Sequence, residues 1–171
     1  MITLETLNQW PTKTFEAELL KCCGSKAWVL ALEKARPFSG EAQLFEAASR
    51  IWKKLTPKDW KEAFSHHPKI GDVESLRKKF SSTSTWASQE QSGVASADES
   101  ILRGLAQGNE RYEKKFGFVF LICATGKSAS EMLEALNKRI DRTAEEELNQ
   151  AVEEQNQIMR IRLKKLFGGS S

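Results

Sequence analysis

Apolar residues recur at intervals of three and four positions along almost the whole chain, which places them on one face of successive helices. Residues that can cap free backbone N–H groups, such as Ser25, Thr56 and Ser128, stand before many of these runs. A single stretch, FVFLICAT at 118–125, has the composition of a buried strand, but the sequence offers no second strand to pair with it. The spacing therefore predicts an all-α fold in which 118–125 is a buried connector, extended or partly helical.

The same spacing and capping signals place the individual helices. We expect helices over 12–24, 25–36, 39–55, 56–67, 72–80, 98–116 and 128–140, and a last one from 143 that runs for roughly 20 residues or more. The small polar residues at 81–93, SSTSTWASQEQSG, favour local hydrogen bonds over helix and predict an ordered loop.

The chain has 171 residues, of which 40% are hydrophobic, so it can bury one core but is short for two ordinary domains. No internal repeat or interdomain linker stands out. We expect one domain over residues 1–171, a helical bundle of about eight or nine helices with irregular connections.

Charge and cysteine content narrow the class of protein. The 26 basic and 23 acidic residues nearly balance, leaving a net charge of +3 with no basic stripe, so we expect no nucleic-acid partner. The three cysteines include no CxxC pair, which favours a reducing compartment. The N-terminal residues resemble no secretory signal, and no segment has the length and apolarity of a membrane span. We expect a soluble, cytoplasmic protein without a membrane partner.

The two histidines are adjacent, and Pro68 after His67 directs the backbone out of the helix at that point. An imidazole at a helix end can exchange a proton near neutral pH, as a general acid or base does. The same position also suits a structural histidine that interacts with the negative end of the helix dipole, and the spacing alone does not separate the two. Two neighbouring imidazoles are too few ligands for a zinc site, so we expect no metal.

Arg162 lies on the predicted apolar arc of the last helix, together with Ala151, Gln155 and Met159. A guanidinium on a buried face needs a partner, which could be a glutamate in a structural ion pair or an anion in a pocket. By contrast, Arg139, Arg142 and Lys164 are interpreted as surface charge.

Glu90 and Gln91 are neighbours in the predicted loop and together could bind the N–H and C=O groups of a urea-like compound. From the spacing alone, a solvated loop glutamate is the favoured interpretation of Glu90. Cys123, inside an apolar run, is more typical of a core residue than of a nucleophile.

Several segments, in order, resemble the family of 2-oxo-4-hydroxy-4-carboxy-5-ureidoimidazoline (OHCU) decarboxylases. They are WVLALEKARPF at 28–38, HHPKIGD at 66–72, EQSG at 90–93, RYEKKFGFVFLIC at 111–123 and MRIRL at 159–163. The combination of HPKIGD with the FGFxF pattern is more specific than any single segment. The resemblance covers almost the whole chain.

The resemblance implies a cofactor-independent decarboxylation of OHCU to (S)-allantoin and CO2, the last step of urate degradation, in a small all-helical enzyme that is often a homodimer. It places the family's catalytic residues on His67, Glu90 and Arg162. The positions that it implies for substrate binding are Pro68, Ala87, Ser88, Gln91, Phe118, Val119, Phe120, Leu121, Ile122 and Cys123. Two positions depart from the family pattern: Ala87 stands where serine is frequent, and Val119 where proline is common.

Two other functions remain open. A related enzyme on the same scaffold would act on another ureido or imidazoline compound, since Ala87 and Val119 differ from the pattern. A non-catalytic binding module would use exposed Trp and Arg residues as a partner surface.

Overall fold

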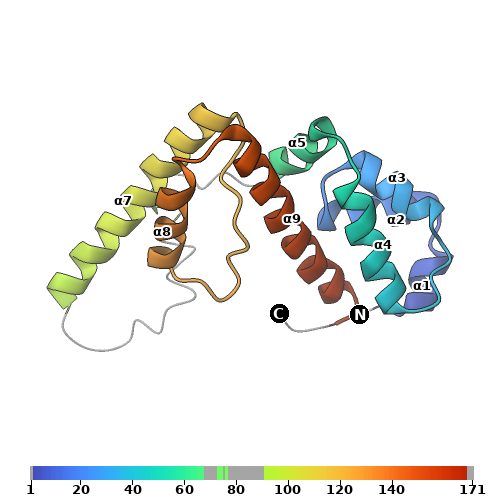
Figure 1. Cartoon of the computed structure of the whole chain (residues 1–171). Helices are drawn as coiled ribbons and strands as arrows, with labels where there is room; N and C mark the ends of the chain where they lie inside the picture. The colour runs from blue at the N-terminus through green and yellow to red at the C-terminus, as the bar shows by residue number, and fades with distance from the viewer. Residues whose placement is uncertain (1, 68–72, 75, 77–90, 169–171) are drawn as a thin grey trace. The chain divides into compact units, whose positions relative to one another are not determined.

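The computed structural model describes residues 2–67, 73, 74, 76 and 91–168; for residues 91–98 it describes the backbone alone. These residues form α-helices and connecting segments, with no β-strand among them, which confirms the predicted all-α class (Figure 1). The predicted helix over 72–80 lies mostly outside the described residues, as does most of the predicted loop over 81–93.

The chain divides into two compact units. The first unit comprises residues 1–66 and 148–171, and the second comprises residues 67–147. The helices are α1 (Leu4–Gln9), α2 (Thr12–Cys22), α3 (Lys26–Lys34), α4 (Glu41–Lys53), α5 (Pro57–Ser65), α7 (Gln91–Phe116), α8 (Ala129–Arg139) and α9 (Ala144–Leu166). The first four residues of α9 belong to the second unit and the rest of that helix to the first.

The core of the first unit is built around two tryptophans. Trp28 and Trp52 are each 0% exposed. Their indole N–H groups donate hydrogen bonds to main-chain carbonyls, Trp28 to Ala48 at 3.0 Å and Trp52 to Val152 at 2.8 Å. A buried indole N–H usually needs such a partner. The two bonds thereby connect α3 to α4 and α4 to α9.

Local capping sets most helix starts where the sequence predicts them. Ser25 caps α3, and Thr56 caps α5 in a capping box with Asp59. Ser128 and Glu131 form a second capping box at the start of α8, and Thr143 and Glu146 make the same reciprocal bonds before α9. The structure confirms these helix starts. They could be predicted because a cap involves only residues three positions apart in the sequence.

Other boundaries differ from the prediction. The sequence analysis did not predict α1, which Thr3 caps through its hydroxyl group. The helix expected from Ser39 begins at Glu41, because Ser39 instead donates its N–H and hydroxyl groups to the side chain of Gln43. The prediction that a helix begins at Asp98 is wrong: α7 begins at Gln91 and continues through the small residues at 92–97.

In the second unit, α7 and α8 pack closely against each other (Figure 1). Two glycines of α7 face leucines of α8. A Cβ at Gly104 would lie 3.0 Å from Leu133, and one at Gly108 would collide with Leu136. A larger residue at either position would therefore require the facing leucine side chain to move.

The stretch over 118–125 is a connector between α7 and α8, as the sequence predicts. Gly117 ends α7 with a φ of 75°, and its N–H donates to the carbonyl of Glu113 at 2.8 Å. The buried residues of the connector are Phe118, Phe120, Leu121 and Cys123. The chain thus passes from α7 to α8 through the core without regular secondary structure.

Two properties of the described residues bear on the class of protein. None of their helices is long and apolar enough to cross a membrane. Their four tryptophans are all at least partly buried: Trp28 and Trp52 completely, and Trp10 and Trp60 in part. The surface of exposed tryptophans that a binding module would use is therefore absent from the described part of the chain.

Candidate active site

His67 directly follows the C-terminal cap of α5. The cap is His66, whose N–H bonds back to the carbonyls of Ala63 and Phe64. His67 itself is half-buried. This confirms that His67 stands at a helix end. Pro68 lies outside the described residues.

His66 is exposed but packs closely against the turn between α2 and α3. A Cβ built on Gly24 would lie 2.6 Å from Cγ of the His66 ring. Gly24 is buried, so a glycine at this position lets the imidazole lie directly on the main chain. The contact holds the C-terminal end of α5, from which His67 follows, against the rest of the first unit.

Arg162 is half-buried on α9. Its Nη1 donates to the carbonyls of Lys21 at 3.3 Å and Cys22 at 3.4 Å, at the C-terminal end of α2. Carbonyls at a helix end have no partner within the helix and carry the negative end of its dipole, so a guanidinium suits them. Among the described contacts, its acceptors are main-chain carbonyls and not a glutamate. The alternative of an anion receptor stays a prediction.

The neighbouring thiols are poor candidates for chemistry. Burial raises the pKa of Cys22 to about 12 although Arg162 lies nearby, and burial likewise raises the pKa of Cys23 to about 12. Both are therefore neutral thiols at physiological pH. Cys123 is 6% exposed, as expected of a core residue.

The aromatic residues of the connector gather around Tyr112 of α7. The ring of Phe118 meets the Tyr112 ring edge-on at a centroid distance of 5.8 Å, and that of Phe120 does so at 5.2 Å. Ile122 packs against the buried cluster of Leu76, Leu102, Leu105 and Met132. Phe118, Phe120 and Ile122 thus contact the core of the second unit. Leu121 is also buried, whereas Val119 is partly exposed.

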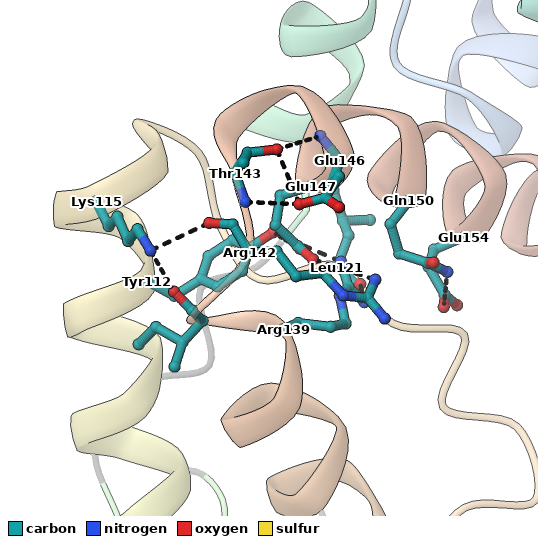
Figure 2. Close-up of polar contacts among 11 residues, drawn as sticks. Tyr112, Lys115, Leu121, Arg139, Arg142, Thr143, Glu146, Glu147, Gln150 and Glu154 are labelled. Atoms are coloured by element: carbon teal, nitrogen blue, oxygen red, sulfur yellow. Dashed lines mark hydrogen bonds and ion pairs between the residues drawn. The ribbon is translucent and has the colours of Figure 1, made fainter.

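Beneath the connector lies a buried polar cluster of Tyr112, Arg139 and Glu147 (Figure 2). Oε2 of Glu147 accepts the Tyr112 hydroxyl at 2.6 Å and Nε of Arg139 at 3.0 Å. Nη1 of Arg139 donates to the carbonyl of Leu121 at 2.7 Å. One guanidinium thereby joins a helix carboxylate to the main chain of the connector. Burial and the bond to the Glu147 carboxylate raise the pKa of Tyr112, so the hydroxyl stays protonated and donates.

The interpretation of Arg139 as surface charge is wrong, because its side chain is only 5% exposed and pairs with the fully buried Glu147. The signal was present in the sequence, since Arg139 follows Met132 and Leu136 on the buried arc of α8. Arg142 has a side chain 42% exposed and lies 3.5 Å from Oε1 of Glu147. Lys164 is exposed, as predicted.

The remaining predicted site residues are only partly described. Ala87, Ser88 and Glu90 lie outside the described residues. Gln91 is the first residue of α7, and only its backbone is described. His67 and the connector belong to the second unit, whereas Arg162 belongs to the first. Within the described residues, no three His, Cys, Asp or Glu side chains gather as metal ligands would.

The chain is similar to proteins of urate degradation. It is 36% identical over 154 residues to the uric acid degradation bifunctional protein TTL of Arabidopsis thaliana, a match that covers 89% of this chain and 47% of that protein. The chain therefore spans about half the length of this relative. It is also 23% identical over 167 residues to a 2-oxo-4-hydroxy-4-carboxy-5-ureidoimidazoline decarboxylase of Haloferax volcanii, covering 97% of this chain and 96% of that protein.

The fold is similar to that of a solved enzyme. A crystal structure of OHCU decarboxylase in the presence of (S)-allantoin superposes with a TM-score of 0.71 and 35% sequence identity, covering 90% of this chain and 99% of that one. A family model described as OHCU decarboxylase matches residues 8–164, which is nearly the whole sequence. With this match added to the ordered motifs and the helical fold, the chain belongs to the OHCU decarboxylase family.

Proposed function

We propose that the protein catalyses the cofactor-independent decarboxylation of OHCU to (S)-allantoin and CO2, the last step of urate degradation. The observation that carries the proposal is the family match over residues 8–164. The position of His67 at the end of α5 and the buried connector over 118–123 support it, since both are elements that the family resemblance assigns to the site.

The substrate needs no external electron sink. Its carboxylate leaves from the ring carbon that bears the hydroxyl group, next to a C=N carbon. When the bond to CO2 breaks, its electron pair forms a C=C bond to that neighbour, and the former C=N pair moves to nitrogen, which takes a proton. The hydroxyl group then loses its proton to become a carbonyl, and the neighbouring carbon gains one.

The protein must therefore orient the carboxylate out of the ring plane, stabilise charge on the ring and deliver a proton to one face. His67 handles the proton next to the substrate hydroxyl group. Glu90 and Gln91 bind the ureido or ring N–H groups, and Arg162 binds an anionic or carbonyl oxygen. Delivery to one face makes the product a single enantiomer.

The residues around the substrate complete the proposed site. The main chain and side chains over 118–123 line the pocket and exclude water, which favours the loss of a poorly solvated carboxylate. Pro68, Ala87 and Ser88 complete the lining. We further propose a single domain over residues 1–171, a cytoplasmic location and a homodimer.

The decisive experiment follows the circular dichroism of OHCU generated freshly from urate by urate oxidase and 5-hydroxyisourate hydrolase, with this protein added last. Wild type should produce the (S)-allantoin signal much faster than spontaneous decay, and His67→Ala should not. His66→Ala is the matched control: the neighbouring imidazole is removed, and the rate should stay within a few-fold of wild type.

Two outcomes would contradict parts of the proposal. Full activity of His67→Ala would remove the histidine from the mechanism. No acceleration by the wild type would exclude OHCU as substrate and favour another ureido or imidazoline compound, as the departures at Ala87 and Val119 allow.

A further inference from the structure

The connector over 118–125 has no helical or sheet hydrogen bonds of its own to set its path. Its main chain is instead bound by side chains from outside: the carbonyl of Leu121 accepts Nη1 of Arg139 at 2.7 Å, and the carbonyl of Cys123 accepts Nζ of Lys127 at 3.0 Å. The Arg139 contact is buried and the Lys127 contact is partly exposed. The buried contact thus holds the middle of the connector.

Arg139 is itself oriented by several groups. Glu147 accepts its Nε at 3.0 Å, and the guanidinium lies over the Phe120 ring at 4.7 Å from the centroid (Figure 2 shows the polar contacts). Tyr112 donates to the same Glu147 oxygen and packs against Phe118 and Phe120. The carboxylate, the phenol ring and the connector therefore define a single position for the guanidinium.

The register of the connector matters because most of its residues are buried in specific contacts. Phe118 and Phe120 pack against the Tyr112 ring, and a shift by one residue would bring the partly exposed Val119 to one of these positions. Apolar packing alone tolerates such exchanges among residues of similar size, whereas a hydrogen bond to one carbonyl does not. A buried ion pair adds little net stability over a pair of apolar residues. The effect expected of the Arg139–Glu147 pair is therefore on the conformation of the connector.

We propose that Arg139 is a positioning residue of the active site: by bonding Glu147 and the Leu121 carbonyl at once, it sets the register of the connector that lines the substrate pocket. The catalytic consequence rests on the proposed function. The effect on the connector does not, because it concerns the protein without substrate.

The test replaces Arg139 by Lys. A lysine keeps the charge beside Glu147, but its single nitrogen cannot span both acceptors as the guanidinium fork does. We expect kcat/KM for OHCU to fall by roughly 10- to 100-fold, as misplaced pocket groups typically cause. The pH dependence of kcat should stay as in the wild type, because the proton-transfer group is unchanged.

Hydrogen exchange of the amides over 118–123 provides the second readout. In Arg139→Lys these amides should exchange at least about tenfold faster than in the wild type, without substrate present. The matched control is Trp52→Phe, which removes a buried hydrogen bond in the first unit. When the two variants are compared at the same loss of Tm, Trp52→Phe should keep the wild-type kcat/KM and the wild-type exchange rates over 118–123.

Each result has a definite meaning. The proposal would be overturned if Arg139→Lys left the hydrogen-exchange protection of residues 118–123 unchanged. It would also be overturned if the wild type acted on OHCU and the kcat/KM of Arg139→Lys stayed within twofold of it. If the wild type does not act on OHCU, the proposed function fails, and faster exchange over 118–123 still supports the positioning role. If Arg139→Lys does not fold, the double variant Arg139→Met with Glu147→Leu replaces it. This variant removes both bonds of Arg139 and leaves no buried charge alone, and unchanged connector protection there would also overturn the proposal.

Discussion

In the described residues of the first unit (2–66 and 148–168) the buried polar groups are neutral, whereas the core of the second unit contains an ion pair. The first unit buries the indoles of Trp28 and Trp52 and two protonated thiols. The second buries Arg139 against Glu147, with Tyr112 donating to the same carboxylate. Both units also bury a large apolar surface.

The two cores are expected to respond differently when a buried hydrogen bond is removed. Loss of a neutral bond leaves a dipole that water or a neighbouring group can partly satisfy, but loss of one member of an ion pair leaves a buried charge. The second unit therefore depends more strongly on a few residues. It is also the unit whose connector crosses the core without helical hydrogen bonds, so the charged cluster determines the path of that connector.

The largest expected effect comes from Glu147→Ala. It leaves the Arg139 guanidinium buried without its carboxylate, which should lower the free energy of unfolding by about 3–5 kcal/mol. Chemical denaturation of the variant and wild type measures the difference. The double variant Arg139→Met with Glu147→Leu should lose less than the sum of its two single variants, because no charge is then left alone. A loss below about 1 kcal/mol for Glu147→Ala would contradict the comparison.

Alkaline pH should act on the thiols of the first unit. Burial raises the pKa of Cys22 and Cys23 from 9.0 to about 12, so the folded state holds protons that the unfolded state releases. The contribution of the protonated thiols to the free energy of unfolding is complete below pH 9. It is lost as pH rises toward 12, at about 1 kcal/mol per pH unit for each thiol. Chemical denaturation at several pH values between 9 and 12 measures how steeply the free energy of unfolding falls with pH.

The control for the alkaline slope is a variant with alanine at both cysteines. Its slope should be shallower than that of the wild type. Burial and the Glu147 carboxylate also raise the pKa of Tyr112 above its ordinary value of 10.0, so the tyrosine adds to the loss above that pH in both proteins. Equal slopes in the two proteins would show that the thiols are not the groups involved.

Trp52→Phe should have a smaller effect than Glu147→Ala. It removes the N–H bond to the Val152 carbonyl and leaves a small cavity, but no charge, so the expected loss is about 1–3 kcal/mol. Thermal and chemical unfolding measure it. Trp60→Phe removes a similar bond, to the carbonyl of Trp52 at 2.9 Å, from a half-buried site and should lose less. A loss for Trp52→Phe as large as that for Glu147→Ala would remove the distinction between the two cores.

The smallest effect is expected from Arg142→Ala. Its guanidinium lies 3.5 Å from Oε1 of Glu147, but its side chain is 42% exposed, so water screens the pair. The free energy of unfolding should fall by less than about 1 kcal/mol, as measured by denaturation at low and high salt. A loss comparable to that of Glu147→Ala would place Arg142 within the buried cluster.

Much of the helical fold could be predicted because its signals are local. Ser25, Thr56 and Ser128 cap helices through residues three positions away, and Gly117 ends α7 by its own backbone conformation. The early start of α7 was missed because small polar residues favour caps and turns as well as helix. Local preference alone did not separate these alternatives.

The candidate site was only partly predictable. The end of α5 beside His67 and the burial of the connector follow from the proline and from apolar composition. The acceptors of Arg162 did not follow, because they are carbonyls of residues about 140 positions earlier in the chain. The residues over 81–90 that would complete the site lie outside the described structure.

Most of the helices, the buried connector and the family could be predicted from the sequence, since helical periodicity, capping and motif order depend on neighbouring residues or on residue identity alone. What the two arginines contact is set by the tertiary structure. Arg139 and Arg162 occupy similar positions on apolar helix faces, yet one meets a buried carboxylate and the other meets carbonyls at a helix end. A buried guanidinium requires partners, but which partners it meets depends on how distant helices pack.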